Sequence, residues 1–320
     1  MSQTSVLEQL KSMTTLVADT GDVNAISQFM PIDATTNPSL LLKAAGMEKY
    51  QGLIQNCIAT AKKNATDQDA RIKAAADAFA IQVGAEILAI IPGRVSTEVD
   101  ARLSFQTDAM VQEARRISAA YLERGFDQKR ILIKIAATWE GIMAAKILEA
   151  EGIGCNLTLM FNFAQALACA NAKVTLVSPF VGRIFDWYTQ KTGETYTPDN
   201  DPGVLSVKRI YEYYRKFDIN TIVMGASFRN IGQIKALSGC DYLTISPALL
   251  QQLDSEAAPL VRTLSKDKAK AQVMDEVFLD EASFRWQMNE DAMATEKLAE
   301  GIRLFNQDLL KLYAVLSEKF

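Results

Sequence analysis

The sequence predicts a closed (β/α)₈ barrel, and three observations lead to this fold class. Short runs of branched and aliphatic residues alternate with longer helical patterns, which is typical of βαβ units around a parallel sheet. Eight such strand candidates occur within 320 residues, a length that suits one large barrel or two average domains. An open doubly wound sheet is the alternative, but no GxGxxG or P-loop motif follows any strand candidate.

The strand candidates follow one another in a regular order. They lie at 14–20, 33–35, 85–96, 131–137, 154–160, 174–180, 221–228 and 241–246. Helical patterns separate them, including a long amphipathic region over 44–79, a helix near 100–123 and another from about Thr138. The segment 190–203 contains Gly, Pro, Asn and Asp and is expected to be a surface loop.

From Glu290 onward the pattern predicts a long helix. Its apolar stripe consists of Met293, Leu298, Ile302, Phe305, Leu309, Leu312 and Val315. We expect this helix to pack across the barrel or against a partner subunit. Because no linker, repeat or low-complexity tract interrupts the pattern, residues 1–320 are expected to form a single barrel domain with extra helices and a long C-terminal helix.

Composition excludes several classes of function. The net charge is −4, from 34 basic and 38 acidic residues without a block of like charge, so neither nucleic acid nor an anionic membrane is an expected partner. The chain has no histidine, which excludes Ser-His and Cys-His nucleophiles, histidine metal ligands and imidazole proton shuttles. Acid–base chemistry must therefore use Asp, Glu, Lys, Tyr or water.

The four cysteines predict a reducing compartment. Cys57, Cys155, Cys169 and Cys240 are far apart and form no CxxC pair, which favours reduced thiols over a disulfide framework or a zinc site. The stretch 1–13 lacks the pattern of a signal peptide, and no apolar run approaches the length of a membrane span. We therefore expect a cytoplasmic protein without a metal.

The run ILIKIAA at 131–137 places a lysine in a strand that otherwise appears buried. Side chains of a strand alternate between its two faces, so the three isoleucines share one face while Leu132, Lys134 and Ala136 share the other. We expect the isoleucines to contact the surrounding helices and Lys134 to point into the barrel. An unpaired buried ammonium is costly, which suggests a chemical reason for this lysine.

Polar residues gather at the C-terminal ends of the other strand candidates. They include Asp19, Thr35, Asn37, Asn156, Thr158, Ser178, Thr244 and Ser246. In the run at 221–228, alternation places Gly225 and Ser227 on the row that continues to Arg229, opposite Met224. Because (β/α)₈ enzymes carry their chemistry at the C-terminal ends of their strands, these residues predict an active site there.

Single residues of this set also have structural explanations. A lysine such as Lys134 is commonly an ion-pair partner, Asp19 a turn or cap residue, and Glu98 an acid at a helix N-terminus. Arg183 and Arg229 would ordinarily be surface charges. The functional interpretation depends on all of them facing one cavity.

A lysine in such a place can act as a nucleophile. At a reference pKa of about 10.4, only roughly one lysine in two thousand is neutral at pH 7, and burial favours the neutral amine. A desolvated lysine attacks a carbonyl to form a Schiff base, after which a neighbouring C–C bond can break with help from an acid–base group such as Asp19 or Glu98. The hydroxyl, amide and guanidinium groups would hold a sugar phosphate through Asn37, Asn156, Thr158, Ser178, Arg183 and Arg229.

Five long segments carry a resemblance to a known family. They are DATTNPSLL (33–41), ILIKIAATWEGI (131–142), GCNLTLMFNFAQA (154–166), SPFVGRIFDWY (178–188) and MGASFRN (224–230). With them the chain closely resembles the transaldolase family, of the longer bacterial and eukaryotic type. The resemblance implies a barrel of the class I aldolase kind, a cytosolic homodimer, and no metal or organic cofactor.

The resemblance also implies a reaction within the non-oxidative pentose phosphate pathway. A dihydroxyacetone unit would pass from sedoheptulose 7-phosphate or fructose 6-phosphate to glyceraldehyde 3-phosphate or erythrose 4-phosphate. By motif, Lys134 would form the Schiff base, Asp19 would serve C–C cleavage, and Glu98 with Thr158 would handle water. Substrate contacts would come from Asn37, Asn156, Ser178, Phe180, Arg183 and Arg229.

Two alternatives remain open. A related Schiff-base aldolase would release the three-carbon unit instead of passing it to a second aldose. A catalytically inactive barrel would only bind sugar phosphates.

Overall fold

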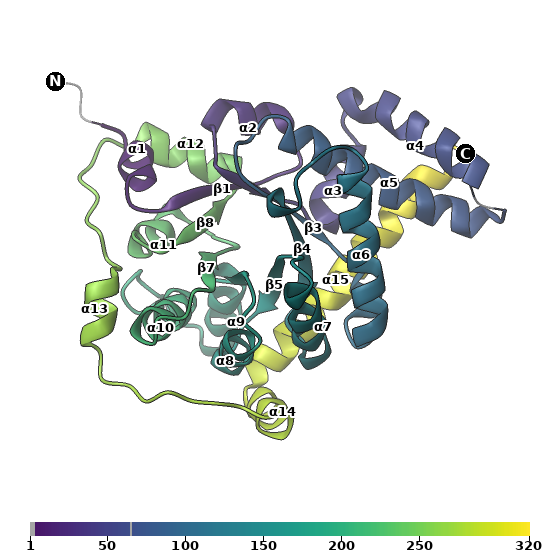
Figure 1. The fold of residues 1–320 in the computed structure, drawn as a ribbon. Helices are drawn as coiled ribbons and strands as arrows, with labels where there is room; N and C mark the ends of the chain where they lie inside the picture. Colours follow the sequence, from purple (N-terminus) through teal and green to yellow (C-terminus); the bar gives the residue numbers. More distant parts are fainter. Residues whose placement is uncertain (1–3, 65) are drawn as a thin grey trace.

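The protein forms a closed barrel of parallel strands surrounded by helices, as the alternating pattern predicts. The computed structural model describes residues 4–64 and 66–320, and within them each strand pairs with its successor while β8 pairs with β1 (Figure 1). The strands are β1 Thr15–Asp19, β2 Asp33–Thr35, β3 Val95–Glu98, β4 Ile131–Ala136, β5 Cys155–Met160, β6 Leu176–Pro179, β7 Ile222–Gly225 and β8 Tyr242–Ile245.

The helices connect successive strands or extend the barrel. They are α1 Val6–Lys11, α2 Val23–Phe29, α3 Pro38–Ala45, α4 Gln51–Asn64, α5 Gln68–Leu88, α6 Thr107–Leu122, α7 Trp139–Ala150, α8 Phe163–Asn171, α9 Gly182–Thr192, α10 Pro202–Lys216, α11 Ile231–Ala236, α12 Pro247–Ser255, α13 Lys266–Ala271, α14 Glu281–Glu290 and α15 Ala292–Ser317, with 3₁₀ turns at Glu48–Tyr50, Ala101–Leu103 and Gln128–Arg130. None of the described helices is both long and apolar enough to cross a membrane.

Side-chain caps fix where the helices near the strand ends begin. Thr138 caps α7, because its hydroxyl oxygen accepts the Gly141 N–H at 2.9 Å. Asn37 caps α3 in the same way by accepting the Leu40 N–H at 2.9 Å, and Pro38 follows at the first helical position. The helix start expected at Thr138 is confirmed.

Several expected elements have different bounds in the structure. The run 85–96 is not one strand, because Ala85 and the residues up to Leu88 complete α5, and only Val95–Glu98 forms β3. The C-terminal half of α5 is buried on several sides, so its apolar residues are continuous and resemble a buried strand. The predicted helix near 100–123 is a 3₁₀ turn followed by α6. The loop expected at 190–203 is shorter and spans 193–201, because α9 extends to Thr192 and α10 begins at Pro202.

The lower interior of the barrel, by which we mean the part nearer the N-terminal ends of the strands, is filled by apolar side chains. Val17, Leu132, Leu176 and Met224 contact one another there, each from a different strand. Leu132 therefore faces inward, as alternation along β4 predicts. The expectation for β7 is wrong, because Met224 occupies the inner row that was assigned to Gly225.

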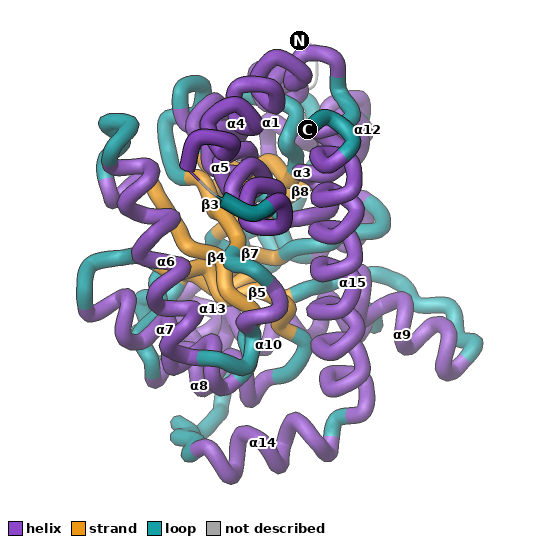
Figure 2. The backbone as a smooth tube through the Cα atoms, turned by 90° about the vertical axis from the view of Figure 1, so that its right-hand side faces the viewer, coloured by secondary structure: helices purple, strands orange, loops and turns teal. Residues whose placement is uncertain are grey.

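The long helix α15 lies beside the barrel strands and packs on its own chain. It contacts α3, α5, β5, α9 and α14, and it flanks the barrel in two perpendicular views (Figure 2). Of its predicted apolar stripe, Met293, Ile302, Phe305 and Leu312 are buried. Packing across the barrel is thus the alternative that the structure confirms.

Candidate active site

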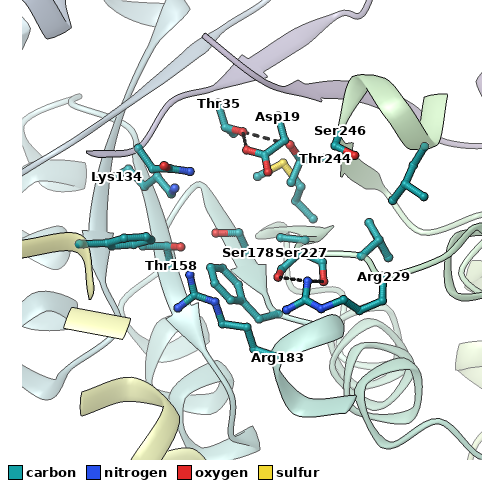
Figure 3. Close-up of a pocket in the computed structure, with 17 residues that line it drawn as sticks. Asp19, Thr35, Lys134, Thr158, Ser178, Arg183, Ser227, Arg229, Thr244 and Ser246 are labelled. Atoms are coloured by element: carbon teal, nitrogen blue, oxygen red, sulfur yellow. Dashed lines mark hydrogen bonds between the residues drawn. The ribbon is translucent and has the colours of Figure 1, made fainter. Parts of the chain in front are cut away.

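A cavity of about 180 Å³ opens at the C-terminal ends of the strands (Figure 3). It is lined by Asp19, Thr35, Asn37, Lys134, Thr158, Ser178, Phe180, Arg183, Met224, Ala226, Ser227, Phe228, Arg229, Thr244, Ser246, Leu249 and Phe305. Eight of the ten predicted site residues are in this lining. Among the described residues, the other two, Glu98 and Asn156, lie behind it and contact lining residues directly.

Lys134 is the buried cation of the cavity. Its side chain extends from the middle of β4, is only 6% exposed, and lies level with Glu98 on β3 and Asn156 on β5 through the strand register. The ammonium nitrogen is 3.2 Å from Glu98 Oε2 and donates a hydrogen bond to the Thr36 carbonyl at 3.3 Å. The pairing explains how the interior of the barrel accepts this charge.

Asp19 ends β1 and accepts a hydrogen bond from the Thr35 hydroxyl. Thr35 Oγ1 donates to Asp19 Oδ1 at 3.0 Å and lies 3.0 Å from Thr244 Oγ1 (Figure 3). Burial raises the pKa of the Asp19 carboxyl, while Lys134 and the Thr35 hydrogen bond oppose the rise. The carboxyl is thereby oriented toward the cavity and holds its proton more readily than a surface aspartate.

Glu98 has a similar environment on the far side of Lys134. Burial raises the pKa of its carboxyl, the Lys134 ammonium opposes this, and the negative charge of Asp19 adds to the rise. Its Oε2 faces Lys134 as an ion pair but has no hydrogen-bond partner among the described residues. Two carboxyl groups with raised pKa values thus flank one amine.

Polar side chains of β3, β5 and β6 form a short chain below the cavity. Asn156 Nδ2 donates to Ser96 Oγ at 3.0 Å, and Asn156 Oδ1 accepts the Ser178 hydroxyl at 2.8 Å. This fixes the orientation of the Asn156 amide. By contrast, the buried Thr158 hydroxyl has no partner among the described residues and is available to a ligand or water.

The two arginines lie across the cavity from Asp19 and Lys134 (Figure 3). Arg229 is 38% exposed and pairs with Asp186, whose Oδ2 is 2.6 Å from its Nη2. Arg183 is more buried, and its Nη1 has no hydrogen-bond partner among the described residues. Two guanidinium groups of this kind can bind a phosphate, because both present several N–H donors in one plane.

The sequence marked some lining residues only indirectly and did not mark Phe305 as a site residue. Phe305 comes from α15, which is distant in sequence from every strand, and only its place on an apolar stripe marked it. Arg229 does reach the cavity, but not by strand alternation: Ser227 adopts a left-handed conformation with φ 62° and redirects the chain. A polar ending of β8 marked Thr244 and Ser246, although their partners were not predictable.

The chemistry available here is that of an amine beside two carboxyls. The described residues include no group of three or more His, Cys, Asp or Glu side chains that could hold a metal ion. An amine in this place, beside carboxyls that can exchange protons, is chemically able to form a Schiff base with a carbonyl compound.

Comparison with known proteins gives the family. Residues 16–316 match the family described as Transaldolase/Fructose-6-phosphate aldolase. The chain is 58% identical over 309 residues to a protein named transaldolase from Agrobacterium fabrum, which covers 97% of this chain and 96% of that protein. It is equally 58% identical to the transaldolase of Alteromonas mediterranea, with 98% of each chain covered.

A third relative, the transaldolase of Rhizobium etli, is 57% identical over 316 residues, which are 99% of this chain and 98% of that protein. The chain therefore belongs to the transaldolase and fructose-6-phosphate aldolase family. The resemblance found in the five sequence segments is confirmed.

Proposed function

We propose that the protein is a transaldolase that transfers a dihydroxyacetone unit between sugar phosphates through a Schiff base on Lys134. The observation that carries this proposal is the buried Lys134 ammonium, 3.2 Å from Glu98 at the wall of a cavity that also holds Asp19. The relatives named transaldolase match nearly the whole chain, which supports the same activity here.

In the first half-reaction, the neutral Lys134 amine attacks the C2 carbonyl of a ketose phosphate. Water leaves and an iminium forms, which draws electrons from the C3–C4 bond. Asp19 accepts the proton of the C4 hydroxyl as that bond breaks, and the aldose phosphate departs. The electron pair remains as an enamine on Lys134, and the raised pKa of Asp19 suits a group that must hold this proton.

In the second half-reaction, the enamine carbon attacks the aldehyde carbon of the acceptor. Asp19 returns its proton to the new hydroxyl, and water then hydrolyses the iminium to free Lys134 and the product. Glu98 and Thr158 are the groups proposed to place this water. Support comes from Glu98 Oε2, which faces the Lys134 ammonium at 3.2 Å, and from the Thr158 hydroxyl; neither oxygen has a hydrogen-bond partner among the described residues.

The remaining polar groups would hold the two ends of the substrate. Asn37, Asn156 and Ser178 would contact the dihydroxyacetone part, with Phe180 forming an apolar wall. Arg183 and Arg229 would bind the phosphate. Arg229 would then divide its N–H donors between the phosphate and its present partner Asp186.

Reduction with borohydride tests the central step. With fructose 6-phosphate present, we expect a reduced three-carbon adduct on Lys134 by mass spectrometry. The absence of an adduct on this residue would contradict the mechanism and favour an inactive sugar-phosphate-binding barrel.

Acceptor dependence separates transfer from simple aldol cleavage. We expect fructose 6-phosphate turnover to require erythrose 4-phosphate or another aldose acceptor. Equally fast release of the three-carbon fragment without an acceptor would identify a Schiff-base aldolase instead.

We also propose that residues 1–320 act as one domain and that the protein is a cytoplasmic homodimer. The resemblance to the family supports the single domain and the homodimer, and the four buried, unpaired cysteines support a reducing compartment. Light scattering during size-exclusion chromatography measures the oligomeric state, and a monomeric mass at micromolar concentration would contradict it.

A further inference from the structure

Arg183 is held by aromatic rings instead of a carboxylate. Its guanidinium carbon lies 4.9 Å from the centre of the Phe180 ring and 5.4 Å from the centre of the Phe305 ring. Both distances are within the range of cation–π attraction. No ion-pair partner of Arg183 occurs among the described residues, whereas Arg229 in the same cavity is fixed by Asp186.

The helix α15 makes a second close approach to this arginine one turn earlier. A Cβ placed on Gly301 would lie 3.2 Å from Arg183 Nη1 and 2.7 Å from Leu159 Cδ2. A glycine inside a helix costs about 1 kcal/mol relative to alanine, so its presence calls for a packing reason. Gly301 leaves the space in which the Arg183 guanidinium lies.

Gly301 and Phe305 act on the same group because of helical geometry. Residues four apart lie on one face of a helix, so the gap at Gly301 and the ring of Phe305 face Arg183 together. The gap admits the guanidinium, and the ring limits its tilt. The centre of the Phe305 ring is also 5.8 Å from Lys134 Nζ, so the same ring is near two of the cations that line the cavity.

We propose that Gly301 and Phe305 are positioning residues for Arg183, and that α15 thereby sets the preference of the cavity for phosphorylated substrates. This inference rests on the proposed role of Arg183 in phosphate binding. A guanidinium held in one orientation at the wall of the cavity can bind a phosphate without first losing conformational freedom.

The test compares erythrose 4-phosphate with erythrose as acceptor at saturating fructose 6-phosphate. In a reaction with two half-steps, kcat/KM for the acceptor reports only the second half, so the ratio of the two values isolates the contribution of the acceptor phosphate. In Phe305→Leu we expect this ratio to fall roughly tenfold, the effect of losing one partly desolvated cation–π contact. A general effect on Lys134 lowers both values equally and cancels in the ratio.

Further variants separate positioning from a loss of structure. Gly301→Ala should lower the ratio in the same direction while the helix itself gains stability, and Phe305→Tyr, which keeps the ring, should retain the ratio. Leu304→Ala, at a 40% exposed position next to Phe305, is the matched control and should leave the ratio unchanged. Thermal unfolding and circular dichroism check that each variant is folded.

Arg183→Ala distinguishes the two levels of the proposal. If this variant leaves the ratio unchanged, the phosphate role of Arg183 is wrong and the inference fails with it. If Arg183→Ala lowers the ratio but Phe305→Leu and Gly301→Ala do not, only the positioning role is wrong. If the phosphate role of Arg183 and the positioning role of Phe305 are both correct, Phe305→Leu should have no further effect on the ratio in the Arg183→Ala background.

Discussion

The barrel interior has two layers of opposite character, and β4 contributes one residue to each. Leu132 belongs to the lower layer, where four apolar side chains contact one another. Lys134, two residues later on the same face, belongs to the upper layer with carboxyls, hydroxyls and arginines. Two inward-facing residues of one strand therefore have different roles: Leu132 packs in the apolar interior, and Lys134 lines the cavity.

The difference arises from what closes each layer. Side chains of the strands alone fill the lower layer, so apolar groups of matching volume are required there. The upper layer is bounded by strand ends, by Arg183 on α9 and by Phe305 on α15, which together enclose a cavity. Charges persist in this layer because each meets a partner from another element.

The largest expected effect is the loss of activity on replacing the upper-layer residue of β4. Lys134→Met should lower kcat by at least about 10³-fold, since the proposed nucleophile is gone. Lys134→Arg keeps the charge and should lose activity as well, because arginine remains protonated. Steady-state turnover of fructose 6-phosphate with erythrose 4-phosphate measures both, and substantial activity in either variant would contradict the division into layers.

The lower-layer residue of β4 should give the opposite result. Leu132→Ala removes buried methyl groups and should lower the unfolding free energy by about 3 kcal/mol. Because Leu132 contributes no polar atom to the cavity, kcat should change only a few-fold. Urea denaturation and turnover of the same preparation provide the comparison with Lys134→Met, and a large loss of kcat without a loss of stability would contradict it.

The charged layer should also make stability depend on pH. Burial raises the pKa of Glu98 above its ordinary value of 4.5, so the folded state binds this proton more tightly than the unfolded chain. The contribution of Glu98 to stability is therefore greatest below pH 4.5 and falls as pH rises to the raised value, by about 1.4 kcal/mol per pKa unit.

The variant Glu98→Gln removes this titration. The unfolding free energy of the protein, minus that of Glu98→Gln, should decrease between pH 4 and pH 7 in urea denaturation. A difference that stays constant or increases with pH would show that the Glu98 carboxyl is not held in the way described.

The smallest expected effect on activity is that of replacing Ser96, which lies between the apolar layer and the cavity. Ser96→Ala removes the acceptor that orients Asn156 and should cost about 1 kcal/mol of stability, with a roughly fivefold loss in kcat. Ser118 is equally buried, at 3% exposure, but lies on α6 outside the barrel, so Ser118→Ala should reduce stability alone. Equal effects of the two variants on kcat would remove the role of Ser96 in the site.

Local patterns predicted the elements that follow a simple period. The alternation of β4 was sufficient to turn Lys134 inward, and the polar strand ends of β1 and β6 marked Asp19 and Ser178. Where an element is buried on several sides, its apolar residues no longer alternate with polar ones and the period cannot be read. The strand predicted to begin at Ala85 was wrong for this reason, because its first residues complete a buried helix.

Contacts between distant elements could not be predicted in the same way. The approach of Phe305 to Arg183 depends on how α15 lies across the barrel, which the helical stripe does not specify. The entry of Arg229 into the cavity follows a left-handed backbone at Ser227, and a serine carries no strong signal for that conformation. In both cases tertiary packing, not the intrinsic preference of a residue, decides which side chain enters the cavity.

The level pairing of Glu98, Lys134 and Asn156 across three neighbouring strands has a consequence for the evolution of this chain's length. One residue inserted or deleted between Ile131 and Lys134 would turn the amine out toward the helices and an isoleucine into the cavity. The loop between α9 and α10 is exposed and bears on no strand register, so it can change length freely. Insertions and deletions should therefore accumulate in that loop among functional descendants, while β4 keeps a constant number of residues.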